Sequence, residues 1–197
     1  MTFEGIIFDC DGTIADTMPL HWQAWRSVAE NYDFEFSEER FYALGGVPAR
    51  DILKRIKEEQ GLDLDPLRIS KEKEEAYLPH LKTVTVIEPV IQVAYEHHGR
   101  IPMAVATGGT RNIISQVLQH LEIDHLFDHL VTSEDVERQK PAPDIFLRAA
   151  SLIGVAPEKC LAYEDTDLGM QAIRSAGMTA IDVRPLRRSA QSLEPEA

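Results

Sequence analysis

The sequence predicts an α/β protein in which a doubly wound parallel sheet forms the core and an all-helical subdomain is inserted near its start. Three observations lead to this prediction. Short apolar runs recur along the chain, helical patterns separate the later runs, and a long segment between the first two runs contains helices but no strand. Continuous apolar runs of this length are typical of parallel strands that are buried on both faces.

The expected strands are short and apolar, and they cover residues 5–8, 103–106, 130–132, 160–163 and 179–183. Between the later strands, apolar side chains recur at helical spacing, which indicates helices over 113–121, 145–153 and 167–176. Gly154 and Gly177 follow the last two helices and are suited to ending them. Strands that alternate with helices in this way indicate a doubly wound sheet.

The segment between the first two strands is far longer than a simple crossover, which needs only about a dozen residues. Pro19, Pro48 and Pro66 each suit the first position of a helix. Ser37 suits an N-cap because two glutamates follow it. We therefore predict a helical cap domain over 17–85 and a core domain formed by 1–16 and 86–197. Because open α/β sheets bind ligands at the carboxyl ends of their strands, an insert that leaves from this edge can cover the site.

The composition narrows the class of partner. A formal net charge of −13 leaves no cationic surplus for nucleic acid, and no apolar segment approaches the length of a membrane helix. The first residues lack the basic region of a signal peptide, and two cysteines in strand-like runs suit a reducing compartment. We expect a cytoplasmic monomer that binds neither nucleic acid nor membrane, with a frayed polar tail over 187–197.

Polar side chains stand at or just after the ends of several expected strands. The acidic ones are Asp9, Asp11, Glu164 and Asp165. Alone, each would most simply be a helix cap or a solvated loop residue, but all of them fall on one edge of one sheet. Carboxylates brought together there repel one another unless a cation neutralises them. A site of oxygen ligands without histidine or cysteine favours a hard ion, and we expect Mg²⁺.

A carboxylate beside Mg²⁺ can attack phosphorus, because the metal offsets the repulsion between two anions and orients the phosphoryl group. Lys140 and the Thr107 hydroxyl would then donate hydrogen bonds to the phosphoryl oxygens. Three glycines allow backbone N–H groups to approach closely, namely Gly12, Gly108 and Gly109. The strand ends therefore predict phosphoryl transfer from a small molecule.

Cys10 is a second candidate nucleophile, because some phosphatases use a cysteine. Such a cysteine is followed six positions later by an arginine that closes the phosphate loop, whereas this chain has Asp16 there. The flanking carboxylates would also raise the pKa of the Cys10 thiol and disarm it. We interpret Cys10 as a core residue.

Together these residues resemble the four motifs of the haloacid dehalogenase (HAD) superfamily. The motifs are Asp9-x-Asp11-Gly12-Thr13-x-x-Asp16, the strand that ends in Thr107, Lys140-Pro-Ala-Pro-Asp144, and Glu164-Asp165-x-x-x-Gly169. The helical insert resembles the cap of the beta-phosphoglucomutase-like branch, through His21-Trp22-Gln23-Ala24-Trp25 and Gly46-Val47. The chain as a whole is similar to bacterial sugar-phosphate phosphatases of the fructose-1-phosphatase type.

This resemblance implies roles for the acidic residues. Asp9 would be the nucleophile that forms an aspartyl-phosphate, and Asp11 the general acid and base. Mg²⁺ would be held by Asp9, the backbone carbonyl of Asp11 and Asp165, with Glu164 ligating directly or through water. Thr107, Gly108 and Lys140 would bind the phosphate.

The resemblance also implies that His21, Gly46 and Val47 face the substrate from the cap. Arg50 and Lys73 are charged cap residues that could face a sugar or a second anion. The mutases of this branch carry an arginine where this chain has Ala49, so Arg50 is displaced by one position.

The sequence thus predicts a Mg²⁺-dependent phosphatase acting on a small sugar phosphate such as fructose 1-phosphate. One alternative is a beta-phosphoglucomutase that interconverts beta-glucose 1-phosphate and glucose 6-phosphate. Thr13 favours the phosphatase, because a valine there would resemble the mutases. A third possibility is a non-catalytic signalling or binding module with a phosphorylated aspartate. Receiver domains of that kind place the phosphorylated aspartate after the third strand and lack a large insert.

Overall fold

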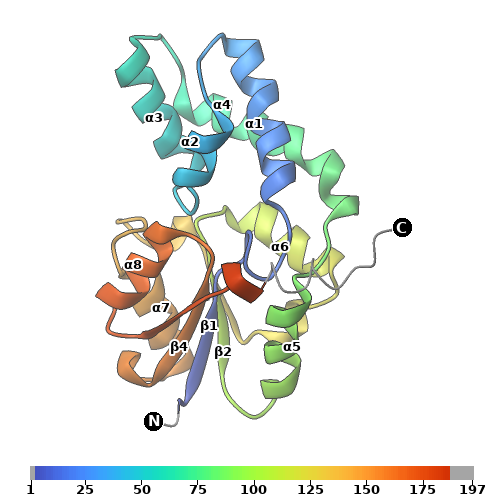
Figure 1. Cartoon of the computed structure of the whole chain (residues 1–197), viewed down its shortest axis with the longest axis vertical. Helices are drawn as coiled ribbons and strands as arrows, with labels where there is room; N and C mark the ends of the chain where they lie inside the picture. The colour runs from blue at the N-terminus through green and yellow to red at the C-terminus, as the bar shows by residue number, and fades with distance from the viewer. Residues whose placement is uncertain (1–2, 187–197) are drawn as a thin grey trace.

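The computed structural model describes residues 3–186 and has a five-stranded parallel sheet at its centre (Figure 1). The strands are β1 (Gly5–Phe8), β2 (Met103–Ala106), β3 (His129–Val131), β4 (Cys160–Glu164) and β5 (Thr179–Asp182). Their order across the sheet is β3-β2-β1-β4-β5, which places β1 in the middle. The predicted α/β fold is confirmed, and the expected frayed tail over 187–197 lies outside the described residues.

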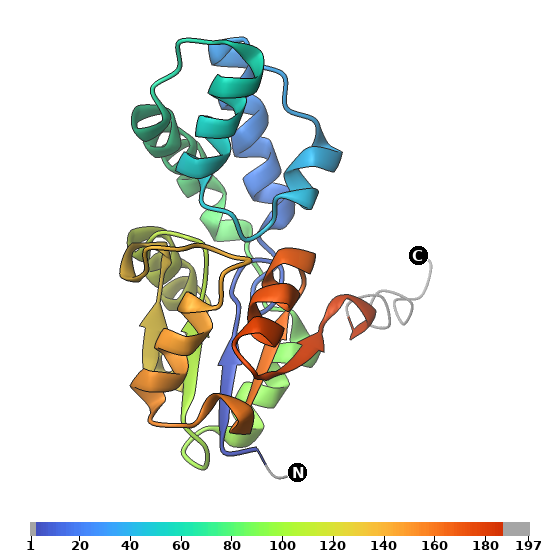
Figure 2. The same ribbon diagram turned by 90° about the vertical axis from the view of Figure 1, so that its left-hand side faces the viewer.

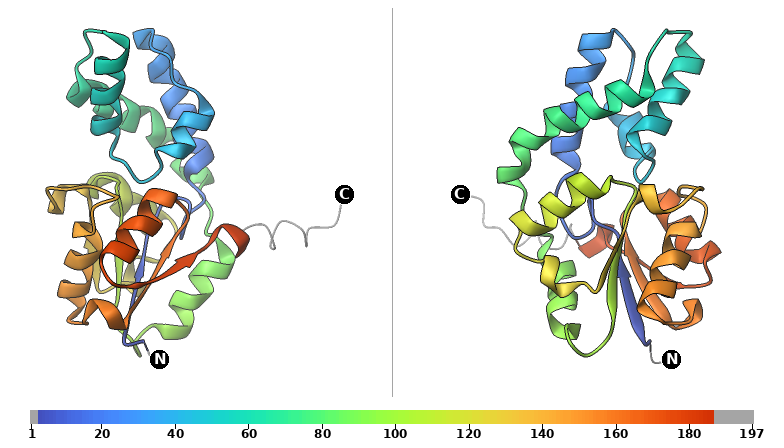
Figure 3. Two further views of the ribbon diagram at one scale, coloured as in Figure 1. Left: turned by 60° about the vertical axis from the view of Figure 1, so that its left-hand side comes forward. Right: turned by 180° about the vertical axis from the view of Figure 1, so that it is seen from behind.

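Helices cover both faces of the sheet (Figure 3). On one face, α5 (Glu88–His97) and α6 (Arg111–His120) pack their apolar side chains against Ile6, Phe8 and Val105. On the other, α7 (Asp144–Ile153) and α8 (Asp167–Ser175) pack against Ile7 and Ala104. Because neighbouring residues of a strand point to opposite faces, a run of apolar residues serves both layers. This arrangement explains why the strands read as continuous apolar runs.

The segment between β1 and α5 is helical. It contains α1 (Met18–Tyr32), α2 (Glu38–Ala43), α3 (Ala49–Gln60), α4 (Pro66–Tyr77) and a 3₁₀ helix at Leu78–Thr83. Most of the apolar side chains of α1 to α4 form a cluster of their own around Trp25, Leu53 and Ile56. These helices lie beyond the carboxyl ends of the strands (Figure 2). The expected domain boundaries after residues 16 and 85 stay predictions.

Local signals explain where these helices begin and end. The Ser37 hydroxyl accepts a hydrogen bond from the backbone N–H of Arg40 at 3.2 Å, as expected of an N-cap. Gly61 ends α3 with a left-handed φ of 66°. Of the three prolines, Pro66 takes the first helical position, whereas Pro48 is the N-cap of α3 and Pro19 is the second residue of α1.

Within residues 3–186, none of the helices combines the length and the apolar character that crossing a membrane would require.

Candidate active site

The first motif turns sharply at the carboxyl end of β1. The backbone N–H of Asp9 donates to the carbonyl of Tyr163 at 3.0 Å, so Asp9 still follows the line of the sheet. Gly12 then adopts a φ of 82°, and a Cβ atom there would lie 2.2 Å from Oδ2 of Asp165. A glycine is required at this position by both the backbone conformation and the close approach of the motif to Asp165.

Lys140 connects two carboxylates at the centre of the site. Its Nζ atom lies 2.7 Å from Oδ1 of Asp9 and 2.7 Å from Oε2 of Glu164, and all three side chains are buried. Burial alone would lower the pKa of Lys140, but the two carboxylates raise it above its ordinary value. Lys140 is therefore a fixed ammonium beside Asp9.

Three carboxylates gather around this ammonium. Asp9, Glu164 and Asp165 each place a carboxylate oxygen within 4.8 Å of the others. Burial, and then Glu164, raises the pKa of Asp9 well above its ordinary value, and Asp165 adds to the effect. One lysine does not neutralise three carboxylates, and hard oxygen donors suit a divalent cation such as Mg²⁺. The group therefore fits a metal ion.

Glu164 is held rigidly within this group. Its Oε1 atom accepts hydrogen bonds from the Thr166 hydroxyl at 2.7 Å and from the backbone N–H groups of Thr166 and Asp165. A Cβ atom at Gly169 would lie 2.1 Å from Cδ of Glu164, so a glycine is needed beneath the side chain. Thr166 also accepts from the Gly169 N–H and caps α8. Thr166 was not singled out from the sequence, although its place directly after Glu164 and Asp165 offered a signal.

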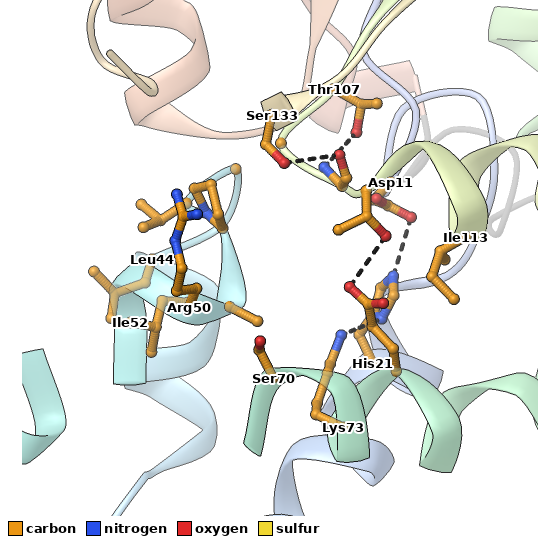
Figure 4. A pocket seen from close by; sticks show the side chains of 18 of the residues that line it. Asp11, His21, Leu44, Arg50, Ile52, Ser70, Lys73, Thr107, Ile113 and Ser133 are labelled. Carbon is orange, nitrogen blue, oxygen red and sulfur yellow. Dashed lines mark hydrogen bonds and ion pairs between the residues drawn. The ribbon is translucent and has the colours of Figure 1, made fainter. Parts of the chain in front are cut away.

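The carboxylate of Asp11 points toward His21 of the helical segment (Figure 4). Its Oδ1 atom accepts a hydrogen bond from the Thr17 hydroxyl at 2.7 Å and lies 3.1 Å from Nε2 of His21. Nδ1 of His21 in turn lies 2.8 Å from Nζ of Lys73. Because an ammonium only donates, Nδ1 must accept from Lys73, which leaves Nε2 as the donor to Asp11. His21 and Lys73, both predicted cap residues, therefore form a series of hydrogen bonds that ends on Asp11.

Burial and charge set the protonation states of Asp11, His21 and Lys73. Burial would raise the pKa of Asp11, but His21, Thr17 and Lys73 together lower it to about 2. Burial lowers the pKa of His21, and the ammonium of Lys73 lowers it further. Burial also lowers the pKa of Lys73, to about 8. Asp11 is thus ionised near neutral pH while His21 is neutral.

Two side chains that contact Asp11 or His21 were not predicted from the sequence. Thr17 precedes α1 and looks like an ordinary N-cap, but its hydroxyl donates to Asp11 and does not cap the helix. Tyr77 stacks on His21 with ring centroids 4.2 Å apart and an angle of 17°. Only the folded chain brings Tyr77, at the end of α4, beside the first motif.

The loop that carries Gly46 and Val47 rests on the core. A Cβ atom at Gly46 would lie 3.1 Å from Cδ of Lys140, and one at Gly108 would lie 2.4 Å from the carbonyl oxygen of Gly46. Thr107 is buried beneath these residues, and its hydroxyl accepts from the Gly109 N–H at 3.1 Å. The predicted phosphate-binding residues therefore lie directly under the cap loop.

A cavity of about 350 Å³ lies between the helical segment and the sheet edge. Asp9, Asp11, His21, Lys73 and Thr107 all line it. Arg50 lines it too, but on the side away from Asp11 and beside Leu44 and Ile52 (Figure 4). The Arg50 side chain is half-exposed and its Nε lies 3.5 Å from Asp51.

Cys10 is fully buried between the two aspartates. Burial, followed by the charges of Asp11 and Asp9, raises the pKa of its thiol well above the ordinary value. A thiol in this state is a poor nucleophile, which agrees with the interpretation of Cys10 as a core residue.

A buried lysine beside three carboxylates at the carboxyl edge of a parallel sheet, under a helical segment, is the arrangement expected of a phosphoryl-transfer class of enzyme. Known proteins agree with this class. A model of the haloacid dehalogenase-like hydrolases matches residues 6–183, and the chain belongs to that family. The predicted resemblance is confirmed.

Individual relatives cover nearly the whole chain. The fructose-1-phosphate phosphatase YqaB of Escherichia coli is 44% identical over 184 residues, which are 93% of this chain and 98% of that protein. The beta-phosphoglucomutase of Bacillus subtilis is 30% identical, and the match covers 91% of this chain and 83% of that protein. Among solved structures, a beta-phosphoglucomutase from Clostridium difficile has a TM-score of 0.81 at 27% identity, covering 92% of this chain and 84% of its own.

Proposed function

We propose that this chain is a Mg²⁺-dependent phosphatase that hydrolyses a small sugar phosphate of the fructose 1-phosphate kind through an aspartyl-phosphate on Asp9. One observation carries the proposal: the Lys140 ammonium lies 2.7 Å from Asp9, and Glu164 and Asp165 stand beside them, next to the cavity that Asp9 lines. The similarity to a fructose-1-phosphate phosphatase over nearly the whole chain supports the substrate class.

Asp9, Glu164, Asp165 and the backbone carbonyl of Asp11 would hold the metal ion. A bound Mg²⁺ supplies positive charge that offsets the repulsion between a carboxylate nucleophile and a phosphoryl anion. Lys140 would add a donor for a phosphoryl oxygen while it keeps Asp9 in place. The Thr107 hydroxyl and the Gly108 N–H would bind the remaining oxygens.

In the first step a carboxylate oxygen of Asp9 forms a bond to phosphorus and the ester P–O bond breaks. The departing alkoxide takes a proton from Asp11. In the second step Asp11 takes a proton from water, whose oxygen attacks the phosphorus and releases Asp9 and inorganic phosphate. Asp11 is ionised in the present arrangement, which suits the second step. An incoming phosphoryl anion raises the pKa of a neighbouring carboxylate, so substrate binding favours the protonated form that the first step needs.

His21 and Lys73 would orient Asp11 for both transfers, and Gly46 and Val47 would close over the bound substrate. We do not assign Arg50 a part in the reaction, because it lies across the cavity from Asp11 (Figure 4). The non-catalytic module considered from the sequence is set aside, because the chain belongs to a family of hydrolases.

The test is release of inorganic phosphate from a panel of hexose and pentose phosphates, with and without Mg²⁺. We expect turnover of a ketohexose 1-phosphate that depends on Mg²⁺ and is lost in Asp9→Asn. The same assay with beta-glucose 1-phosphate and its 1,6-bisphosphate tests the mutase alternative through formation of glucose 6-phosphate. Full turnover by Asp9→Asn would refute the mechanism.

A further inference from the structure

Besides Asp9 and Asp11, two further carboxylates line the same cavity. Glu74 comes from α4, and Glu134 comes from the 3₁₀ turn Ser133–Asp135 that follows β3. Both reach the start of α6. Oε1 of Glu74 accepts from the Thr110 hydroxyl at 3.1 Å, and Oε2 of Glu134 accepts from the backbone N–H of Arg111 at 2.7 Å. Hydrogen bonds to adjacent residues bring the two carboxylates to one wall of the cavity.

This wall carries two carboxylates, and Lys73 and Lys71 offset only part of their charge from a distance. Among residues 3–186, no Lys, Arg or His nitrogen forms an ion pair with Glu74 or Glu134. Burial raises the pKa of Glu74 above its ordinary value, and the charge of Glu134 adds to this, although the Thr110 hydroxyl and the ammonium groups of Lys73 and Lys71 oppose it. Of the cations that line the cavity, Lys73 bonds to His21, Arg50 lies beside Asp51, and Lys71 is exposed. Lys73 and Lys71 act on Glu74 without forming an ion pair with it.

We propose that Glu74 and Glu134 are specificity-determining residues, which bind the hydroxyl groups of an uncharged sugar tail and reject a second phosphate. This inference rests on the proposed phosphatase function. An ionised carboxylate only accepts hydrogen bonds, so each keeps free lone pairs for sugar hydroxyls. A phosphate dianion carries no donor to offer and meets like charge, which opposes its binding. Glu74, the less exposed of the two, makes the larger contribution.

The acidic wall at the start of α6 also bears on the mutase alternative, because it disfavours a second phosphate. A mutase that works through a bisphosphate must hold two phosphates in one cavity, one at the nucleophile and one at the far end. Here the site beside Asp9 offers Lys140, whereas the wall at the start of α6 offers two carboxylates. The cavity therefore suits a substrate with one phosphate and a neutral remainder.

The experiment compares two substrates that differ only in the second phosphate, fructose 1-phosphate and fructose 1,6-bisphosphate. kcat/KM for phosphate release is measured for the full chain and for Glu74→Gln, Glu134→Gln and the double variant. Glutamine keeps an oxygen that accepts from Thr110 or Arg111, so the fold is preserved, and thermal melting checks this. Glu158→Gln is the matched control, because it removes the same charge from an exposed residue outside the cavity.

We expect the unmodified chain to prefer the monophosphate by at least about tenfold, and Glu74→Gln to raise the bisphosphate-to-monophosphate ratio by about tenfold. Glu134→Gln raises the ratio less, because its carboxylate is exposed and screened. Both variants lower kcat/KM for the monophosphate, and Glu158→Gln changes neither value. Equal use of both substrates by the unmodified chain, or an unchanged ratio in the double variant, overturns the inference alone. Absence of phosphate release from every substrate overturns the proposed function and this inference with it.

Discussion

Replacing Gly108 with alanine tests whether the cap loop must rest on the core during turnover. The added Cβ would lie 2.4 Å from the Gly46 carbonyl oxygen and 3.0 Å from the Gly46 carbonyl carbon. An ordinary carbon–oxygen contact requires a further separation of about 1 Å. Both neighbours are backbone atoms, so no side chain can rotate away and the loop itself must move. Gly108 lacks a left-handed φ, so alanine adds no backbone strain of its own.

The expected loss is in activity and not in stability. A displacement of about 1 Å in groups that position a substrate can cost on the order of 100-fold in rate. We expect kcat/KM for the sugar phosphate to fall by roughly 30- to 100-fold in Gly108→Ala. The free energy of unfolding should change by less than about 1 kcal/mol, because the loop can lift without opening a buried core.

Gly61→Ala is the matched control with the opposite signature. Gly61 ends α3 with a φ of 66°, and nothing lies within 4 Å of an added Cβ. Alanine there is strained, so we expect a loss of about 1 kcal/mol in stability with unchanged kcat/KM. Phosphate release and urea denaturation of both variants separate the two effects. Unchanged kcat/KM in a folded Gly108→Ala would show that the contact plays no part in turnover.

Three other predictions follow from the buried charges. Lys140→Met leaves Asp9 and Glu164 without their shared cation, so urea denaturation should show a loss of about 3–5 kcal/mol; Lys159→Met, which removes an exposed pair with Glu4, should cost less than about 1 kcal/mol. Chelation of divalent cations should abolish phosphate release, and Mg²⁺ at 100 times its Kd should raise the free energy of unfolding by about 2.7 kcal/mol; an unchanged melting temperature across a Mg²⁺ titration contradicts the metal site. Burial lowers the pKa of Lys73 to about 8 from an ordinary 10.5. Between these values the unfolded chain binds more protons, so the free energy of unfolding should rise with pH, by up to ~3 kcal/mol, and Lys73→Met should remove that rise; equal slopes in both proteins would refute the assignment.

Much of the fold follows from the sequence because parallel strands are buried on both faces, and continuous apolar runs reveal them. The third strand shows the limit. Thr132 was expected in it, but its hydroxyl and N–H both bond to Asp135, so a local capping box ends the strand one residue earlier. Helix α5 was not predicted, although Val90, Ile91 and Ala94 carry a helical spacing and bury against the sheet. The expected monomeric state and cytoplasmic location stay predictions.

The composition of the candidate site was predictable because carboxyl ends of parallel strands meet at one edge. The hydrogen bonds and ion pairs between these side chains could not be predicted. Which carboxylate bonds to Lys140 depends on a contact across 131 positions of sequence. Likewise, the pattern of the first motif gives no sign that Asp11 turns toward His21. Side-chain partners of this kind are set by the docking of α1 and α4 above the sheet, which no local pattern encodes.

The two aspartates of the first motif avoid each other's charge by facing different partners. Asp9 is tied to Lys140, which belongs to the sheet edge, whereas Asp11 is tied through His21 to Lys73 on α4. The buried Cys10 separates them and belongs to the core. A shift of α4 relative to the sheet would therefore change the charges around Asp11 while the bond between Lys140 and Asp9 is kept. Under the proposed roles, the helical segment controls proton transfer, and the sheet edge controls the nucleophile.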